Sequence, residues 1–248
     1  MQLIVLGSSS KGNCYLLQNE SDTLIIECGV SINDIKKALN FSFDNVAGCI
    51  VSHEHGDHAK SIVDALKVGI EVYTSRGTIR ALELDVRHHR LHTIKEGEVF
   101  NVGPFKIMPF KIEHDVAEPL GFIINHPECG NVLFITDSYY VKDTFKNIHN
   151  IIIEANFSQE IIEERVRNGA SPDFLRNRIF KSHMSIETCK KTLLANDLSK
   201  VQNIVLIHLS DGNSNAAQFK QIIQSATGKK VFVADAGDII ENFNKNPF

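Results

Sequence analysis

Residues 51–60, VSHEHGDHAK, gather side chains that can bind metal at the point where an apolar run ends. His53, His55, Asp57 and His58 directly follow the sequence AGCIVS. One interpretation is a polar loop that happens to be rich in histidine. The other is a metal site, because imidazole and carboxylate groups together suit zinc, manganese or iron. The second interpretation requires further ligands elsewhere in the chain.

The composition sets limits on the class of protein. The chain has 248 residues, of which 43% are hydrophobic and 23% charged, as in ordinary soluble globular proteins. No apolar run approaches the roughly 20 residues of a membrane span, and MQLIVLGSSS reads as a first strand rather than a signal peptide. A formal net charge of -4 lacks the basic excess typical of proteins that follow a long polyanion. We therefore expect no membrane contact and a cytoplasmic location.

The cysteines are odd in number, scattered and without a C-x-x-C motif, so we expect buried free thiols. They are Cys14, Cys28, Cys49, Cys129 and Cys189.

The order of expected strands and helices predicts an α/β fold. No repeat, low-complexity tract or linker interrupts the chain, so residues 1–248 are expected to form one domain. Periodicity and turn residues predict strands at 2–7, 14–19, 23–28, 47–52, 71–74, 105–114, 120–126, 131–137, 150–155, 203–209 and 229–235. They predict helices at 31–40, 75–84, 158–168, 185–197 and 215–226, with a proline-containing loop between 168 and 185. This pattern is typical of two sheets packed face to face with helices over the outer faces.

Further ligand types stand at the ends of other strands. His114, Asp137 and His208 each end an apolar strand. A single histidine at a strand end is more often structural, but chance seldom places a ligand type at the end of each strand. Seven such side chains exceed the roughly four ligands of one metal and suit two. Asp137 is the candidate carboxylate shared between the metals, which at about 3.5–4 Å apart can activate water and bind both oxygens of a displacement.

His-x-His-x-Asp-His, with the three later residues at strand ends, resembles the metallo-β-lactamase superfamily along nearly the whole chain. The resemblance implies an αββα sandwich of two mixed sheets with two divalent metals at one edge, most simply Zn²⁺, with Mn²⁺ an alternative. It assigns His53, His55 and His114 to one metal. It assigns Asp57, His58 and His208 to the other, with Asp137 bridging. Because His55 replaces the Glu of diiron flavoprotein relatives, a hydrolytic site is favoured.

Two more residues resemble a catalytic pair of tRNase Z and related phosphodiesterases. Glu154 in IIIEANF and His183 in SHMSIE resemble a Glu that orients a His, which donates a proton to the leaving oxygen. The alternative is that Glu154 forms a cap or salt bridge and His183 is an exposed loop residue. With Asp57, these two are the predicted catalytic residues.

The branch of the superfamily follows from other landmarks. No room exists between His114 and Asp137 for the tRNA-gripping arm of tRNase Z. GSSSKGNCYLL, HDVAEPLGF and HLSDGNS resemble the YycJ/WalJ-like nucleases and also the phage anti-Pycsar phosphodiesterases. The second resemblance implies hydrolysis of cyclic mononucleotides such as cyclic CMP or cyclic UMP, to counter a host antiviral defence. It also implies a homodimer, with residues 168–182 a candidate contact. The alternatives are a metal-dependent 5′ exonuclease on DNA and, more distantly, a non-catalytic metal-binding sensor.

Several loop residues are candidates for substrate contact. Ser9 and Lys11 lie in GSSSKGN, which can cradle a phosphate or form a simple hairpin loop. Ser210 and Asn213 follow His208 and either line the mouth of the site or cap the next helix. Residues 87–92, RHHRLH, are interpreted as a solvated loop away from the ligands.

Overall fold

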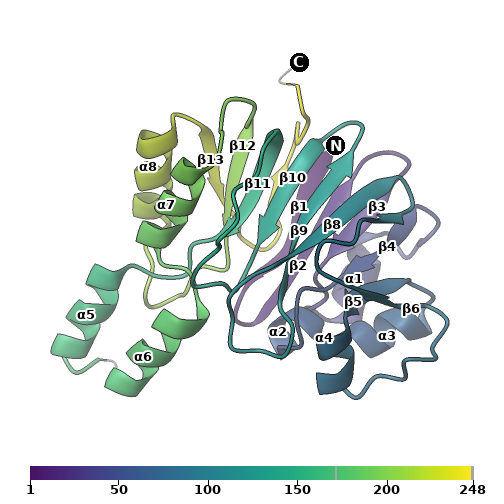
Figure 1. Ribbon diagram of the computed structural model, residues 1–248, viewed down its shortest axis with the longest axis horizontal. Coiled ribbons are helices and arrows are strands. Elements are labelled where there is room, and N and C mark those ends of the chain that lie inside the picture. The colour runs from purple at the N-terminus through teal and green to yellow at the C-terminus, as the bar shows by residue number, and fades with distance from the viewer. Residues whose placement is uncertain (171, 247–248) are drawn as a thin grey trace.

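A computed structural model describes residues 1–170 and 172–246 and places the strands in two sheets that face each other (Figure 1). The first sheet has seven strands in the order β14-β1-β2-β3-β4-β5-β6. Their bounds are β1 Gln2–Ser9, β2 Gly12–Gln18, β3 Thr23–Ile26, β4 Val46–Ile50, β5 Val72–Ser75, β6 Leu91–Ile94 and β14 Ile239–Ile240.

The second sheet also has seven strands, in the order β13-β12-β11-β10-β9-β8-β7. Their bounds are β7 Phe100–Val102, β8 Phe105–Lys111, β9 Leu120–His126, β10 Gly130–Ile135, β11 Ile148–Glu154, β12 Asn203–Ile207 and β13 Lys230–Val233. Strands β10, β11, β12 and β13 are parallel to one another, while β9 is antiparallel to β8 and β10. The carboxyl ends of these four adjacent strands therefore meet at one edge.

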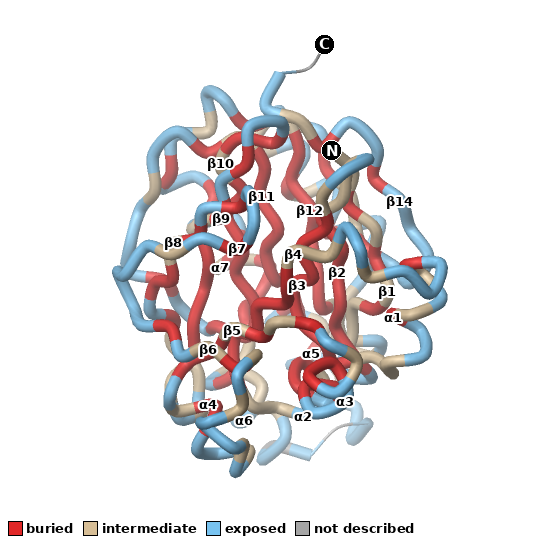
Figure 2. The backbone as a smooth tube through the Cα atoms, turned by 90° about the vertical axis from the view of Figure 1, so that its right-hand side faces the viewer, coloured by how far each residue is buried: buried red, intermediate tan, exposed pale blue. Residues whose placement is uncertain are grey.

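The main core lies between the sheets, where Figure 2 shows the buried strands. Alternate residues point inward, as Leu3 and Val5 do in β1, and meet residues such as Phe122 and Phe134 of the second sheet. Separate clusters cover the outer faces of both sheets. The resulting αββα sandwich confirms the predicted fold class.

The helices cover the two outer faces and one end of the sandwich. Their bounds are α1 Ile32–Ala38, α2 Gly56–Ala59, α3 Ile62–Lys67, α4 Arg76–Ala81, α5 Gln159–Arg167, α6 Asp173–Ser182, α7 Ile186–Ala195 and α8 Ala216–Thr227. The side chains of Ser31, Ser75 and Ser185 accept hydrogen bonds from the backbone N–H group of the third residue of α1, α4 and α7, respectively. Helices α7 and α8 pack on the second sheet, and α5 and α6 project from it (Figure 1).

The predicted loop between residues 168 and 185 is wrong, because part of it forms α6. Pro172 stands at the N-cap of this helix with φ -77°, a position where its missing N–H costs nothing. The segment shows little helical periodicity of buried residues, since Ser182 is its one buried side chain among those described. Hydrophobic periodicity, which reflects burial, is the main sequence signal for a helix. Its weakness in this segment explains the error.

Within the described residues, every helix is too short or too polar to cross a bilayer. All five cysteines are buried and free, as predicted.

Candidate metal centre

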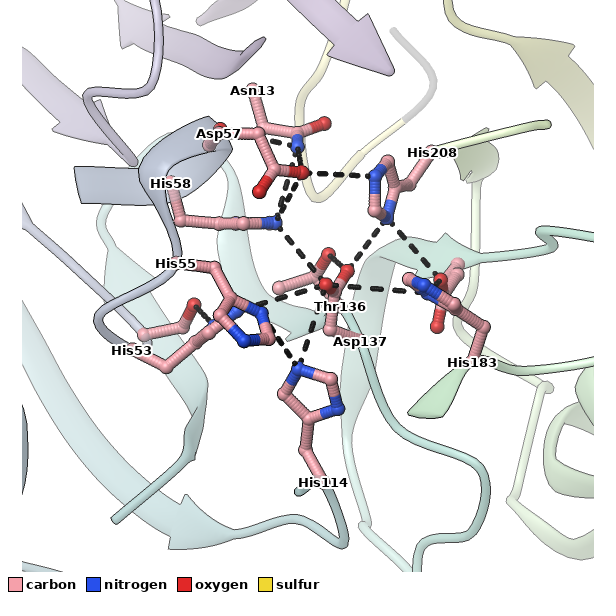
Figure 3. Close-up of polar contacts among 12 residues, drawn as sticks. Asn13, His53, His55, Asp57, His58, His114, Thr136, Asp137, His183 and His208 are labelled. Atoms are coloured by element: carbon pink, nitrogen blue, oxygen red, sulfur yellow. Dashed lines mark hydrogen bonds and ion pairs between the residues drawn. The ribbon is translucent and has the colours of Figure 1, made fainter. Parts of the chain in front are cut away.

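The seven predicted ligands converge at one edge of the sandwich (Figure 3). Strand β4 leads into the loop and short helix α2 that carry the first ligands, and β8, β10 and β12 each end just before another. The seven are His53, His55, Asp57, His58, His114, Asp137 and His208. Parallel strands that end side by side bring residues distant in sequence to one edge.

The backbone at two ligands adopts the left-handed region, which non-glycine residues rarely enter. Asp137 has φ 43° and His208 has φ 55°, each immediately past the end of its strand or one residue later. Such conformations cost roughly 1–3 kcal/mol and cluster at functional sites. They turn both side chains towards the same point between the sheets.

The first ligand group consists of His53, His55, His114 and Asp137. His55 Nδ1 lies 3.2 Å from His114 Nε2. Asp137 Oδ2 lies 3.6 Å from His53 Nε2 and 3.8 Å from His114 Nε2. The four ligand atoms thus surround one small space.

The second ligand group shares Asp137 with the first and adds Asp57, His58 and His208. His58 Nε2 lies 3.4 Å from Asp57 Oδ2 and 3.3 Å from Asp137 Oδ2. Asp57 Oδ2 lies 3.3 Å from His208 Nε2. Asp137 Oδ2 therefore belongs to both groups, as expected of a bridging carboxylate.

The spacing of these ligand atoms suits bonds to divalent cations better than hydrogen bonds between the side chains. Bonds of about 2.0–2.1 Å to a tetrahedral ion separate its ligand atoms by about 3.3 Å, close to the spacings found here. The buried His53 Nε2 and His208 Nε2 make no hydrogen bond among the described residues. A buried nitrogen without a partner is costly, and a cation at these points would satisfy both.

The charges of the cluster differ between the groups. Burial, then His58, holds the pKa of His53 well below its usual range, which favours the neutral imidazole that binds a cation. Burial alone would lower the pKa of His58 and His208, but the charge of Asp137 raises both well above the usual value. Burial would raise the pKa of Asp137, but His208 and His58 hold it well below its usual range. Cations in the second group would take the place of these protons.

Residues outside the ligand set orient the histidines. Ser52 Oγ lies 2.8 Å from His53 Nδ1, which leaves Nε2 for the metal. The buried carboxylate of Glu27 accepts from Ser52 N and lies 3.5 Å from His58 Nδ1. Neither role was predicted, although Glu27 ends the apolar run TLIIE and is therefore a signal of the same kind as the ligands.

A second supporting network comes from the β1–β2 hairpin. His208 N donates to Ser8 Oγ, which lies 3.0 Å from Tyr15 Oη, and Tyr15 Oη donates to Asn13 Oδ1. Asn13 Nδ2 then donates to both Asp57 O and Asp57 Oδ2 at 3.3 Å. The network joins ligands of the second group through side chains of the GSSSKGNCYLL segment, for which the sequence predicted no role in holding the ligands.

Glu154 and His183 meet beside the metal ligands. Glu154, the last residue of β11, is fully buried, and its Oε1 lies 2.8 Å from His183 Nδ1 and 3.2 Å from His208 Nδ1. Its Oε2 accepts from the backbone N–H groups of Ser138 and Met184. Burial would lower the pKa of His183, but the charge of Glu154 raises it above its usual value. His183 is therefore held by one nitrogen, with the other available.

A cavity of about 460 Å³ opens beside the ligands. Of the candidate substrate residues, Ser210 and Asn213 line it, joined by a hydrogen bond from Asn213 Nδ2 to Ser210 Oγ. Ser9 and Lys11 line a neighbouring cavity of about 770 Å³ instead. Residues 87–92 lie apart from both cavities, but they are not all a solvated loop, because Leu91 and His92 begin strand β6, where Leu91 is buried and His92 pairs with Glu71.

Comparison with known sequences identifies the family. The family described as Beta-lactamase superfamily domain matches residues 23–209. Exodeoxyribonuclease YycJ of Bacillus anthracis is 26% identical over 98% of this chain and 96% of its own length. Exodeoxyribonuclease WalJ of Streptococcus pneumoniae is 26% identical over 94% of this chain and 89% of its own.

Solved structures share the fold. The metallo-beta-lactamase fold protein YhfI from Bacillus subtilis superimposes with a TM-score of 0.70 at 18% identity, covering 97% of this chain and 99% of its own. Human tRNase Z, short form, gives 0.64 at 15% identity, with coverages of 97% and 99%. Since the family match spans most of the sequence and the ligand geometry accompanies it, the chain is a metal-dependent hydrolase of the beta-lactamase superfamily.

Proposed function

We propose that the protein is a phosphodiesterase with two divalent metal ions, most simply Zn²⁺, whose leaving-group acid is His183. The observation that carries this proposal is the contact of 2.8 Å between His183 Nδ1 and the buried carboxylate of Glu154, directly beside the shared ligand Asp137. A positioned acid serves phosphodiester cleavage because an alkoxide is a poor leaving group. A metal-binding sensor has no use for such a pair.

The residues of the site fall into metal ligands and a proton-donating pair. Bound ions would supply Lewis acidity and a nucleophile formed from water. His53, His55 and His114 would hold one ion, Asp57, His58 and His208 the other, and Asp137 both. Glu154 holds the proton on His183 Nδ1, so that His183 Nε2 donates the second proton to the departing oxygen.

The proposed substrate is a 3′,5′-cyclic mononucleotide such as cyclic CMP or cyclic UMP, opened to a nucleoside monophosphate. A cavity of about 460 Å³ suits a ligand of this size. Opposition to a cyclic-nucleotide antiviral defence is the role that follows for a phage-encoded chain. A homodimer with a contact at residues 168–182 belongs to the same proposal, although Ser171 within that segment lies outside the described residues.

A second candidate is a 5′ exodeoxyribonuclease on the same centre. Two relatives are named exodeoxyribonuclease. Helix α6, which was predicted as a loop, carries Arg176, Arg178 and Lys181, and the side chain of its Phe174 is 74% exposed. Exposed aromatic rings with basic neighbours suit the bases and backbone of a single strand.

One experiment separates the candidates. Purified, metal-loaded protein is given cyclic mononucleotides and 5′-labelled single- and double-stranded DNA in parallel, with His183→Ala as the matched inactive control. Hydrolysis of cyclic mononucleotides alone supports the first candidate. Stepwise release of nucleotides from DNA, without hydrolysis of any cyclic mononucleotide, would reject it in favour of the nuclease.

A further inference from the structure

Helix α6 forms one wall of the metal cavity with a single face. Leu175, Arg178, Ile179 and Ser182 line the cavity. Their positions i, i+3, i+4 and i+7 lie on one side of an α-helix. The helix ends at its C-cap His183, so the same wall leads directly to the proposed acid.

Arg178 stands out on this wall. Among the described residues that line the cavity, it is the one arginine or lysine. In the described part of the chain, no hydrogen bond or ion pair engages its guanidinium group, whereas Arg90 pairs with Glu71 at 3.1 Å and Arg165 donates to Gly212 O at 2.9 Å. Its backbone carbonyl accepts from Ser182 Oγ. The guanidinium group is therefore available to a ligand.

The chemistry of the wall fits one class of ligand. A guanidinium fork binds phosphate through two parallel hydrogen bonds. A phosphate at the metal centre would have oxygens that the ions do not cover, and Arg178 lines the same cavity. Leu175 and Ile179 add apolar surface on either side of Arg178, of the kind that contacts a sugar or base.

We propose that the inward face of α6 is the recognition surface for a nucleoside phosphate. Arg178 binds a phosphate oxygen, and Leu175 and Ile179 contact the nucleoside. The inference rests on the proposed phosphodiesterase function, but its test measures binding and needs no turnover.

The experiment compares two ligands by calorimetric titration of the full-length, metal-loaded protein: inorganic phosphate and uridine 5′-monophosphate. The variants are Arg178→Gln, Arg178→Lys and Ile179→Ala. The control, Lys181→Gln, removes a positive charge from the same helix at a position that does not line the cavity. Metal content and melting temperature of each variant are checked against the wild type.

The expected pattern separates the two contacts. Arg178→Gln weakens both ligands by roughly 10- to 100-fold, because a hydrogen bond to a charged group is lost, and Arg178→Lys recovers part of that loss. Ile179→Ala weakens uridine 5′-monophosphate by several-fold and leaves inorganic phosphate unchanged. Lys181→Gln changes neither.

Other outcomes overturn the proposal. Equal losses of affinity in Arg178→Gln and Lys181→Gln would mean that the positive charge of the helix as a whole attracts the ligand, rather than a direct contact with Arg178. Unchanged affinities in Arg178→Gln, or no binding of either ligand to the wild type, would remove Arg178 from the site. If the binding pattern holds while no phosphodiester is hydrolysed, the recognition surface stands and the proposed function fails.

Discussion

The ligand edge and helix α6 border the same cavity but are built in opposite ways. His53 and His58 are fully buried, and further side chains fix their rings. On α6, Phe174 is 74% exposed, and Ser182 is the one buried side chain among those described. Stability in a protein follows burial, so the ligand edge should behave as part of the core and α6 as a region that opens easily. The fold thus pairs a rigid site for chemistry with an adaptable wall for recognition.

The largest effect is expected at the ligand edge, from removal of the carboxylate that both ligand groups share. Asp137→Ala should abolish turnover of any phosphodiester, because both ligand groups lose the same oxygen. Asp64→Ala, which removes an exposed carboxylate from α3, is the matched control and should retain full activity. Measured turnover in Asp137→Ala near the wild-type rate would contradict the bridging role.

The next effect separates the acid from the ligands. His183→Ala should keep its metals and lose roughly 10²–10⁴-fold in rate on an unactivated diester, the usual contribution of a general acid. On a nitrophenyl phosphodiester, whose leaving group needs no proton, the loss should be small. Equal losses on both substrates, measured side by side, would count against the acid role.

A smaller effect concerns stability. Ions at about 1,000 times their dissociation constant contribute about 4 kcal/mol, and a chain of this size shifts its melting temperature by about 2–4 °C per kcal/mol. A chelator should therefore lower the melting temperature by roughly 8–16 °C in scanning calorimetry. Hydrogen exchange should quicken at residues 53–58 far more than in α6. A chelator that affected both regions equally would erase the contrast between them.

The smallest expected effect concerns the stability of helix α6. Phe180 stacks on Phe157 with ring centroids 5.1 Å apart, which ties α6 to the body of the protein. Phe180→Ala should remove an aromatic pair that contributes about 0.5–1.5 kcal/mol beyond burial. Hydrogen exchange in α6 should accelerate while the melting temperature falls by only a few degrees. A large fall would show that α6 unfolds together with the core.

The same contrast explains what the sequence could predict. His208 follows a continuous apolar run and His114 follows a strand of alternating burial, so spacing and periodicity located them together. Asn13 and Ser8 act through hydrogen bonds between distant segments, which no local pattern reveals. Helix α6 was missed because its contacts are few and its residues mostly exposed, so its helical period carried no burial signal. The loop residues Ser9 and Lys11 were predicted as candidate contacts to a substrate phosphate. The hairpin that carries them places them along the neighbouring cavity instead.

Metal analysis of the purified protein tests the central claim most directly. Inductively coupled plasma mass spectrometry on chelator-free wild type and Asp137→Ala gives the number of ions per chain. Two ligand groups that share one oxygen predict close to two transition-metal ions in the wild type and the loss of at least one in the variant. A wild type without metal, or a variant that retains both ions, would contradict the dinuclear centre.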